Sequence, residues 1–183
     1  MDRPNSSSGA HAAWLGCLLL SAGCAVIDVN HAQPLDPEER FVLLPIENYS
    51  EAPQAGEKVE AILTTMLRAR RLPVERLEPA AAEVAPELDE ERRYQRGLEA
   101  ARPGGARYGV TGSVIEWRYK NGLDADPAVS VSLRVVEVGS GKVVWSASGS
   151  RTGWGSDSLG AVAQVLLRDL VAEMKFTRSP DSE

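Results

Sequence analysis

The chain has 183 residues, of which a quarter are charged, and a formal net charge of −6 at pH 7. This length favours one domain with its own hydrophobic core. The negative charge and the lack of any basic stretch argue against nucleic-acid binding, because that binding needs a basic face that neutralises phosphates.

The N-terminal residues have the pattern of an export signal. An apolar run over residues 12–20 is too short to span a bilayer, and Ser21-Ala22-Gly23-Cys24 follows it. Small residues before a cysteine are typical of a bacterial lipoprotein signal. The pattern predicts a signal peptide over residues 1–23 and lipid attachment at Cys24. The alternative is an ordinary secretory signal, which would leave Cys24 as a lone exported thiol.

The segment after the cysteine predicts no regular structure. Residues 24–39 contain two prolines and several acids but no periodic apolar pattern. We expect them to form the lipid anchor and a short tether. The folded domain is expected over residues 40–176, and residues 177–183 are expected to be a polar tail.

The first half of this domain alternates between strand and helix signals. Phe41–Leu44 is a short apolar run that predicts a buried strand. Apolar residues recur with helical spacing from Val59 to Leu67, and Pro73 ends that helix. A second strand is expected over residues 74–77 and a second helix over residues 89–101, which ends before Pro103-Gly104-Gly105.

The second half changes to the strand period of two. Residues 108–119, 128–138 and 143–150 alternate between apolar and polar side chains, and Gly139–Lys142 predicts a hairpin turn between the last two. Ser156 or Asp157 is expected to cap a final helix with an apolar stripe. The order predicts a single α/β domain, whose mixed β-sheet ends in a C-terminal antiparallel meander and is flanked by helices.

Few residues in the predicted domain could support catalysis. After residue 23 the chain has one histidine, His31 in the expected tether, and no cysteine except Cys24. A His-based triad, a Cys–His pair and a zinc site therefore lack their ligands. Gly139–Lys142 also lacks the flanking residues of a phosphate-binding loop. The sequence predicts no catalytic residues, no cofactor and no metal.

Five motifs in the second half resemble one known family: Tyr108-Gly-Val-Thr-Gly-Ser-Val114, Glu116-Trp-Arg-Tyr-Lys120, Gly122-Leu-Asp-Ala-Asp-Pro127, Val143-Val-Trp-Ser-Ala-Ser-Gly149 and Arg151-Thr-Gly-Trp154. Together they resemble the PelC lipoproteins of the Pel exopolysaccharide export system. A wider similarity extends to the curli-secretion lipoprotein and TolB N-terminal domains. The resemblance implies a lipid-anchored protein on the periplasmic face of the outer membrane. It also implies a dodecameric ring beneath a β-barrel porin that guides a cationic polysaccharide.

The acidic loop between the first two meander strands has two interpretations. Asp124 and Asp126 lie near Gly122 and Pro127, and aspartate commonly initiates turns. If the resemblance to PelC holds, the same carboxylates repeated around a ring would form a negative collar for a polycation.

Aromatic and basic residues are candidates for membrane or subunit contacts. Trp154 lies between two glycines and close to Arg151, which suits a lipid headgroup or a neighbouring subunit. Trp117 and Tyr119 fit either a membrane-facing rim or ordinary sheet packing. Arg107 and Arg118 are possible interface residues, and the alternative for Arg107 is a solvated loop charge.

Two other functions are alternatives to the ring. A module that docks on and activates a cell-envelope synthase would need a long tether, whereas the expected one has about 16 residues and reaches roughly 20–25 Å. A pore that itself spans the membrane conflicts with Glu116, Arg118 and Arg134, because these charges lie where strands would meet lipid.

Overall fold

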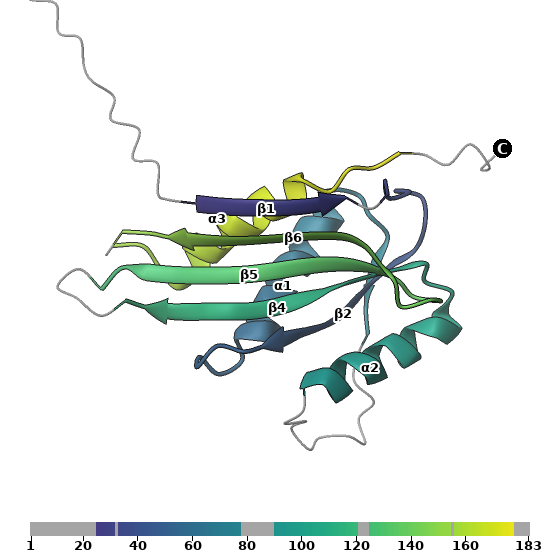
Figure 1. The fold of residues 1–183 in the computed structure, drawn as a ribbon, viewed down its shortest axis with the longest axis horizontal. Helices are drawn as coiled ribbons and strands as arrows, with labels where there is room; N and C mark the ends of the chain where they lie inside the picture. The colour runs from purple at the N-terminus through teal and green to yellow at the C-terminus, as the bar shows by residue number, and fades with distance from the viewer. Residues whose placement is uncertain (1–24, 32, 78–89, 121–124, 155, 178–183) are drawn as a thin grey trace, which may run out of the picture.

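The computed structural model describes residues 25–31, 33–77, 90–120, 125–154 and 156–177 (Figure 1). Its elements follow the chain in this order: β1 (Ala25–His31), β2 (Phe41–Asn48), α1 (Ala55–Ala69), β3 (Val74–Arg76), α2 (Glu90–Ala101), the 3₁₀ turn η1 (Arg102–Gly104), β4 (Tyr108–Tyr119), β5 (Pro127–Glu137), β6 (Val143–Thr152) and α3 (Leu159–Ala172). In this part of the chain, no helix is long and apolar enough to cross a membrane.

The strands form one open six-stranded sheet in the order β1-β6-β5-β4-β2-β3. β4, β5 and β6 pair antiparallel as the predicted meander, whereas β2 lies parallel to both β3 and β4. The crossovers through α1 and α2 make the parallel half. The prediction of one mixed α/β domain with a C-terminal meander is confirmed.

Helices α1 and α3 cover one face of the sheet and enclose the main core (Figure 1). The apolar stripe of each helix faces inward, and Trp145 of β6 lies in this core, only 1% exposed. Burying each large aliphatic side chain contributes roughly 1.5–3 kcal/mol. The cap of α3 is neither of the expected residues, because Ser158 accepts the hydrogen bond from the Ala161 amide.

Helix α2 packs on the opposite face, where it covers only the part of the sheet near the start of β2 (Figure 1). Leu98 and Ala101 contact Val42 and Leu44 there in a smaller core. Gly97 permits this close approach, because a Cβ at that position would lie 2.5 Å from the Pro45 ring.

The expected tether is instead folded onto the domain. β1 pairs antiparallel with β6 over its whole length, and Ile27 and Val29 pack against the main core. Leu35 is also fully buried, and its backbone pairs with the chain after α3. The hydrogen bonds to β6 and the two inward apolar side chains thus order β1. This strand is too short for its apolar residues to show a clear strand period in the sequence.

A bulge in β4 changes the predicted faces of that strand. Val114 pairs with Val131 and Glu116 with Ser130, so Ile115 and Glu116 together oppose one residue of β5. The extra residue shifts the alternation by one. Trp117 therefore faces the same core as Val114, although the strict alternation expected over residues 108–119 would put these two residues on opposite faces.

The rest of the α2 side of the sheet has no helix over it among the described residues, and we call it the open face. It is polar, and serines occupy matched positions on its three central strands: Ser113, Ser130, Ser132, Ser146, Ser148 and Ser150. Asp28 and Asn30 continue the same rows onto β1.

Candidate functional site: the strand-end surface and the open face

Four strands of the sheet meet at one end of the domain. β1 begins there, β4 and β6 end there, and β5 starts there (Figure 1). The register brings Ala25 opposite Arg151 and Tyr119 opposite Pro127. Because Ala25 follows the predicted lipid-attachment residue, Cys24 is covalently tied to this end. We call it the strand-end surface; its exposed members are Val26, Tyr119, Lys120 and Trp154.

Trp154 projects from the loop between β6 and α3. Its side chain is 61% exposed, while its backbone amide donates to Asp157 and its carbonyl accepts from the amide of Asp157. A Cβ on the preceding Gly153 would lie 2.5 Å from Val162 and 2.8 Å from the Asp157 carboxylate. The loop is therefore pinned at its base while the indole is presented outward, as expected for a contact residue.

The acidic loop lies at the same end. Asp124 lies outside the described residues, whereas Asp126 is half-buried and its carbonyl accepts from the Lys120 amide at 2.8 Å. Ala125 has φ of 45°, a left-handed value that an alanine adopts at some cost. Within the described residues, Oδ1 of Asp126 is buried without a hydrogen-bond partner.

The other predicted contact residues divide into inward and outward side chains. Trp117 is only 6% exposed and belongs to the main core, whereas Tyr119 is exposed at the strand end. Arg151 points to the helical side and pairs with Asp169 of α3 at 3.6 Å. The structure thus brings Tyr119 and Trp154 together at one surface and uses Trp117 and Arg151 within the fold.

The two candidate interface arginines each have a partner in the same chain. Arg107 donates to Glu39 at 2.6 Å and lies over the Tyr108 ring, which fixes the chain leading into β2. The hydrogen bond to Glu39 raises the pKa of Arg107 further above its usual value. Arg118 pairs with Glu116 two residues earlier, on the open face.

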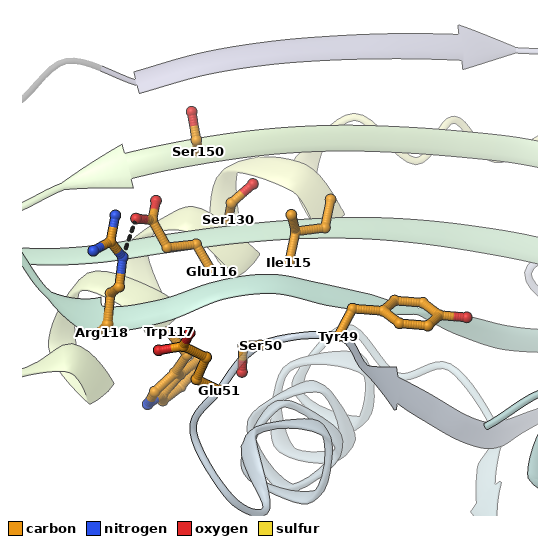
Figure 2. A pocket seen from close by; sticks show the side chains of 9 residues that line it. All are labelled: Tyr49, Ser50, Glu51, Ile115, Glu116, Trp117, Arg118, Ser130 and Ser150. Atoms are coloured by element: carbon orange, nitrogen blue, oxygen red, sulfur yellow. Dashed lines mark hydrogen bonds and ion pairs between the residues drawn. The ribbon is translucent and has the colours of Figure 1, made fainter. Parts of the chain in front are cut away.

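A groove of about 630 Å³ lies where β4 extends past the end of β2 (Figure 2). Tyr49, Ser50 and Glu51 border it from the segment after β2, and the bulged part of β4 supplies the other wall. Tyr49 and Ile115 are 63% and 55% exposed. Sequence reasoning missed this groove, because it depends on the bulge and on the different lengths of two paired strands.

A buried carboxylate, also missed from the sequence, links the helices and strands around β2, on the side of the sheet that ends in β3. Glu60 of α1 accepts from the Ile46 amide and pairs with Arg93 of α2 and Arg76 of β3. Burial is the main cause that raises the pKa of Glu60, although both arginines oppose it. The cluster joins α1, β2, β3 and α2.

The described residues contain no group of three acids, histidines or cysteines placed to hold a metal ion. The features that remain are a strand-end surface with exposed aromatics, an acidic loop beside it, and an open polar face with a groove. All of them are suited to contacts with large partners.

Comparisons with known proteins agree with this description. The structure resembles that of a PelC dodecamer from Paraburkholderia phytofirmans, with 33% identity, a TM-score of 0.70, and coverage of 85% of this chain and all of the other. The chain belongs to the PelC family. A dodecamer of a PelC point variant from the same organism gives 32% identity, a TM-score of 0.71, and coverage of 84% and 100% of the two chains.

More distant similarity concerns the fold only. Lipoprotein GNA1162 from Neisseria meningitidis matches with 21% identity and a TM-score of 0.53, covering 74% of this chain and 96% of its own. No protein-family model and no curated protein matches the sequence. Membership of PelC, a lipoprotein family of the Pel system, supports a homo-oligomer in the cell envelope.

Proposed function

We propose that this PelC protein is a non-enzymatic ring component of an outer-membrane polysaccharide exporter. The chain is anchored by acylated Cys24 to the periplasmic face of the outer membrane. The ring, a dodecamer like its relatives, guides a cationic exopolysaccharide to an outer-membrane porin during biofilm matrix export. The observation that carries this proposal is the shared end of the sheet, where the residue after Cys24, exposed aromatics and the acidic loop lie together.

Membrane attachment through this end has a simple physical basis. The lipid on Cys24 ties the chain to the membrane at one point, and amphipathic side chains at the same end would orient the domain against the headgroups. Trp154 and Tyr119 provide amphipathic rings of the kind that prefer the lipid headgroup region, and Lys120 adds a positive charge for anionic headgroups. Because β1 begins directly after the anchor, the domain lies against its membrane.

The guiding role depends on repetition of charge. One exposed carboxylate attracts an amine weakly, on the order of 0–1 kcal/mol. A ring multiplies the carboxylates of Asp124 and Asp126 around one circumference, and their summed field holds many amines that each exchange quickly. Such a field favours movement of a polycation over tight binding at one point.

The test is export by a strain whose only copy of the protein carries Asp124→Asn and Asp126→Asn. We expect secreted polymer to fall severalfold, and Asp124→Lys to reduce it further because it reverses the local sign. Asparagine is nearly as good as aspartate in turns. Normal secretion by the double Asn variant, with normal protein level and lipidation, would therefore contradict the collar.

A synthase-docking role is the alternative function. It predicts that the protein copurifies with a cell-envelope synthase and raises its activity in vitro, and that the double Asn variant leaves export unchanged.

A further inference from the structure

β1 is the outermost strand on its side of the sheet and pairs only with β6 (Figure 1). From Ala25 to Asn30, four residues are exposed, and Ile27 and Val29 are only partly buried against the main core. Most residues of β5 are buried by comparison. β1 therefore contributes little to the core, and apolar burial, the main stabilising force in folding, holds it weakly.

The partner strand offers β1 few side-chain contacts. Ile27 lies opposite Gly149, which has no side chain. Val29 lies opposite Ala147, whose side chain is one methyl group. On the open face, β1 places polar side chains opposite the serines of β6. Because cross-strand pairs of larger side chains are what usually stabilise a sheet, the backbone hydrogen bonds to β6 are the principal hold on β1.

The chain that follows β1 is held much more firmly. Leu35 is fully buried, its amide donates to the Lys175 carbonyl at 3.0 Å, and its carbonyl accepts from the Thr177 amide at 2.9 Å. We call Leu35 and these two backbone bonds the clasp. Next to it, Arg107 donates to Glu39 at 2.6 Å. A weakly held strand thus borders a firmly held segment, and local opening typically stops at such a boundary.

The sheet is complete without β1. β6 stays paired with β5 from Val143 to Thr152, and Trp145 keeps its place in the main core. The edge of β6 that β1 covers is rich in serine. Water can replace the backbone hydrogen bonds that β6 would lose there.

We propose that β1 is a releasable strap, which peels from β6 as far as the clasp and docks again as a unit. The proposal rests on the lipid at Cys24 in the proposed function and adds a second state to the anchored domain. With β1 docked, the lipid is tied to the strand-end surface. With β1 released, residues 24–34 become a tether of about 11 residues with a typical reach of roughly 17–20 Å.

The two states suit different steps of assembly. The released strap lets the domain turn and meet other copies while its lipid stays in the membrane. Docking removes the slack and brings Trp154 and Tyr119 to the headgroups, because both lie at the strand end where β1 begins. Membrane contact favours the docked state, since only there do the lipid and these side chains reach one surface together.

A disulfide staple across the strap tests its release. Asp28 lies directly opposite Ser148, so Asp28→Cys with Ser148→Cys joins β1 to β6. Ser132→Cys with Ser148→Cys is the matched control, because it uses the same position of β6 but joins it to β5. Both pairs are made in the mature chain with Cys24→Ser, which leaves no other thiol. The mass of the intact protein confirms each disulfide, and Asn30→Cys with Ser146→Cys repeats the test at the next pair on that face.

Hydrogen exchange followed by mass spectrometry compares the oxidised and reduced forms. The β1 amides that bond to β6 should exchange at least tenfold more slowly with the β1 staple closed, because the staple prevents release. The β5 amides should keep their rates, and residues 35–41 should be protected in both forms. The control staple should leave β1 exchange unchanged.

Two results would overturn the strap. Equal β1 exchange in the oxidised and reduced forms would show that β1 opens only with the whole domain. Exchange of residues 35–41 at the same fast rate as β1 would show that the clasp does not bound the opening.

Secretion tests the use of the strap in the cell. In a strain whose only copy is the lipidated protein with the β1 staple, polymer export should fall severalfold below that of a strain with the control staple. Growth with a membrane-permeant reductant should restore it. Equal export by both strains, with the β1 disulfide formed, would overturn the role of the strap. The proposed function would still stand, because the substitutions at Asp124 and Asp126 test it separately.

Discussion

Replacement of Glu60 tests whether the cost of its burial or the attraction of its ion pairs has the larger effect on the stability of the domain. Its side chain is 8% exposed and contacts the Ile46 amide, Arg76 and Arg93. Glu60→Ala removes the acceptor of all three donors. Removing one partner of a buried ion pair costs about 3–5 kcal/mol. We expect about 3 kcal/mol, because Arg76 is 40% exposed and regains water.

Glu60→Gln separates charge from hydrogen bonding. The amide oxygen can still accept from the Ile46 N–H, but the negative charge is lost. Burial raises the pKa of Glu60 in the folded protein above the unfolded value of about 4.3. A raised folded pKa stabilises the protein fully below the unfolded pKa, and this stabilisation is lost as pH rises through the folded pKa. Wild type should therefore lose stability relative to the Gln variant as pH rises from the unfolded pKa through the folded one.

Urea unfolding followed by circular dichroism measures both effects. The Cys24→Ser background avoids the lipid, and one protein concentration is kept throughout because association adds stability. A Gln variant that loses stability relative to wild type as pH rises would contradict this expectation, since attraction to Arg76 and Arg93 would then outweigh burial. An Ala variant whose free energy of unfolding lies within about 1 kcal/mol of the wild-type value would show that water satisfies the Ile46 amide, Arg76 and Arg93 as well as Glu60 does.

Three further outcomes follow from the same structure. Cys24→Ser should abolish incorporation of radiolabelled palmitate and release the protein from membranes; equal labelling of both proteins would show that the anchor is misassigned. In the Cys24→Ser background, Trp154→Ser should weaken binding to anionic vesicles severalfold at unchanged unfolding midpoint, and Val143→Ser, the control, should bind normally. Gly97→Val should destabilise the domain by about 1–3 kcal/mol in urea unfolding, because its side chain overlaps the Pro45 ring; no loss would show that α2 shifts freely.

The sequence predicts most of the fold because strong periodic signals coincide with its main elements. The α1 stripe and the alternation in β5 and β6 each continue over several repeats, and turn residues separate them. β1 offers only Ile27 and Val29 as inward positions, so its order comes from the β6 ladder rather than from its own pattern.

The candidate site is less predictable, because it is a product of tertiary structure. Glycine neighbours and a short polar loop were enough to suggest that Trp154 is exposed. The bulge at Ile115 has no local signature, and it sends Trp117 into the core and creates a groove wall. Glu60 also lies beside an apolar stripe like any flanking helix residue, and only the approach of β2 and α2 buries it.

A flexible insertion between Cys24 and Ala25 distinguishes a membrane-bound ring from a module that searches for a distant enzyme. In the structure β1 starts at Ala25, so no slack separates the anchor from the sheet. A linker of about 30 glycine and serine residues, beginning with alanine to preserve the residue after the cysteine, adds a typical reach of roughly 30 Å. The strand-end surface would then leave the membrane for most of the time.

If Trp154, Tyr119 and the lipid act together, the long linker should reduce secretion although lipidation and protein level are unchanged. A linker of about two residues is the control and should be tolerated. A synthase activator gains from a longer reach, so undiminished export with the long linker would favour docking over a ring that lies against its membrane.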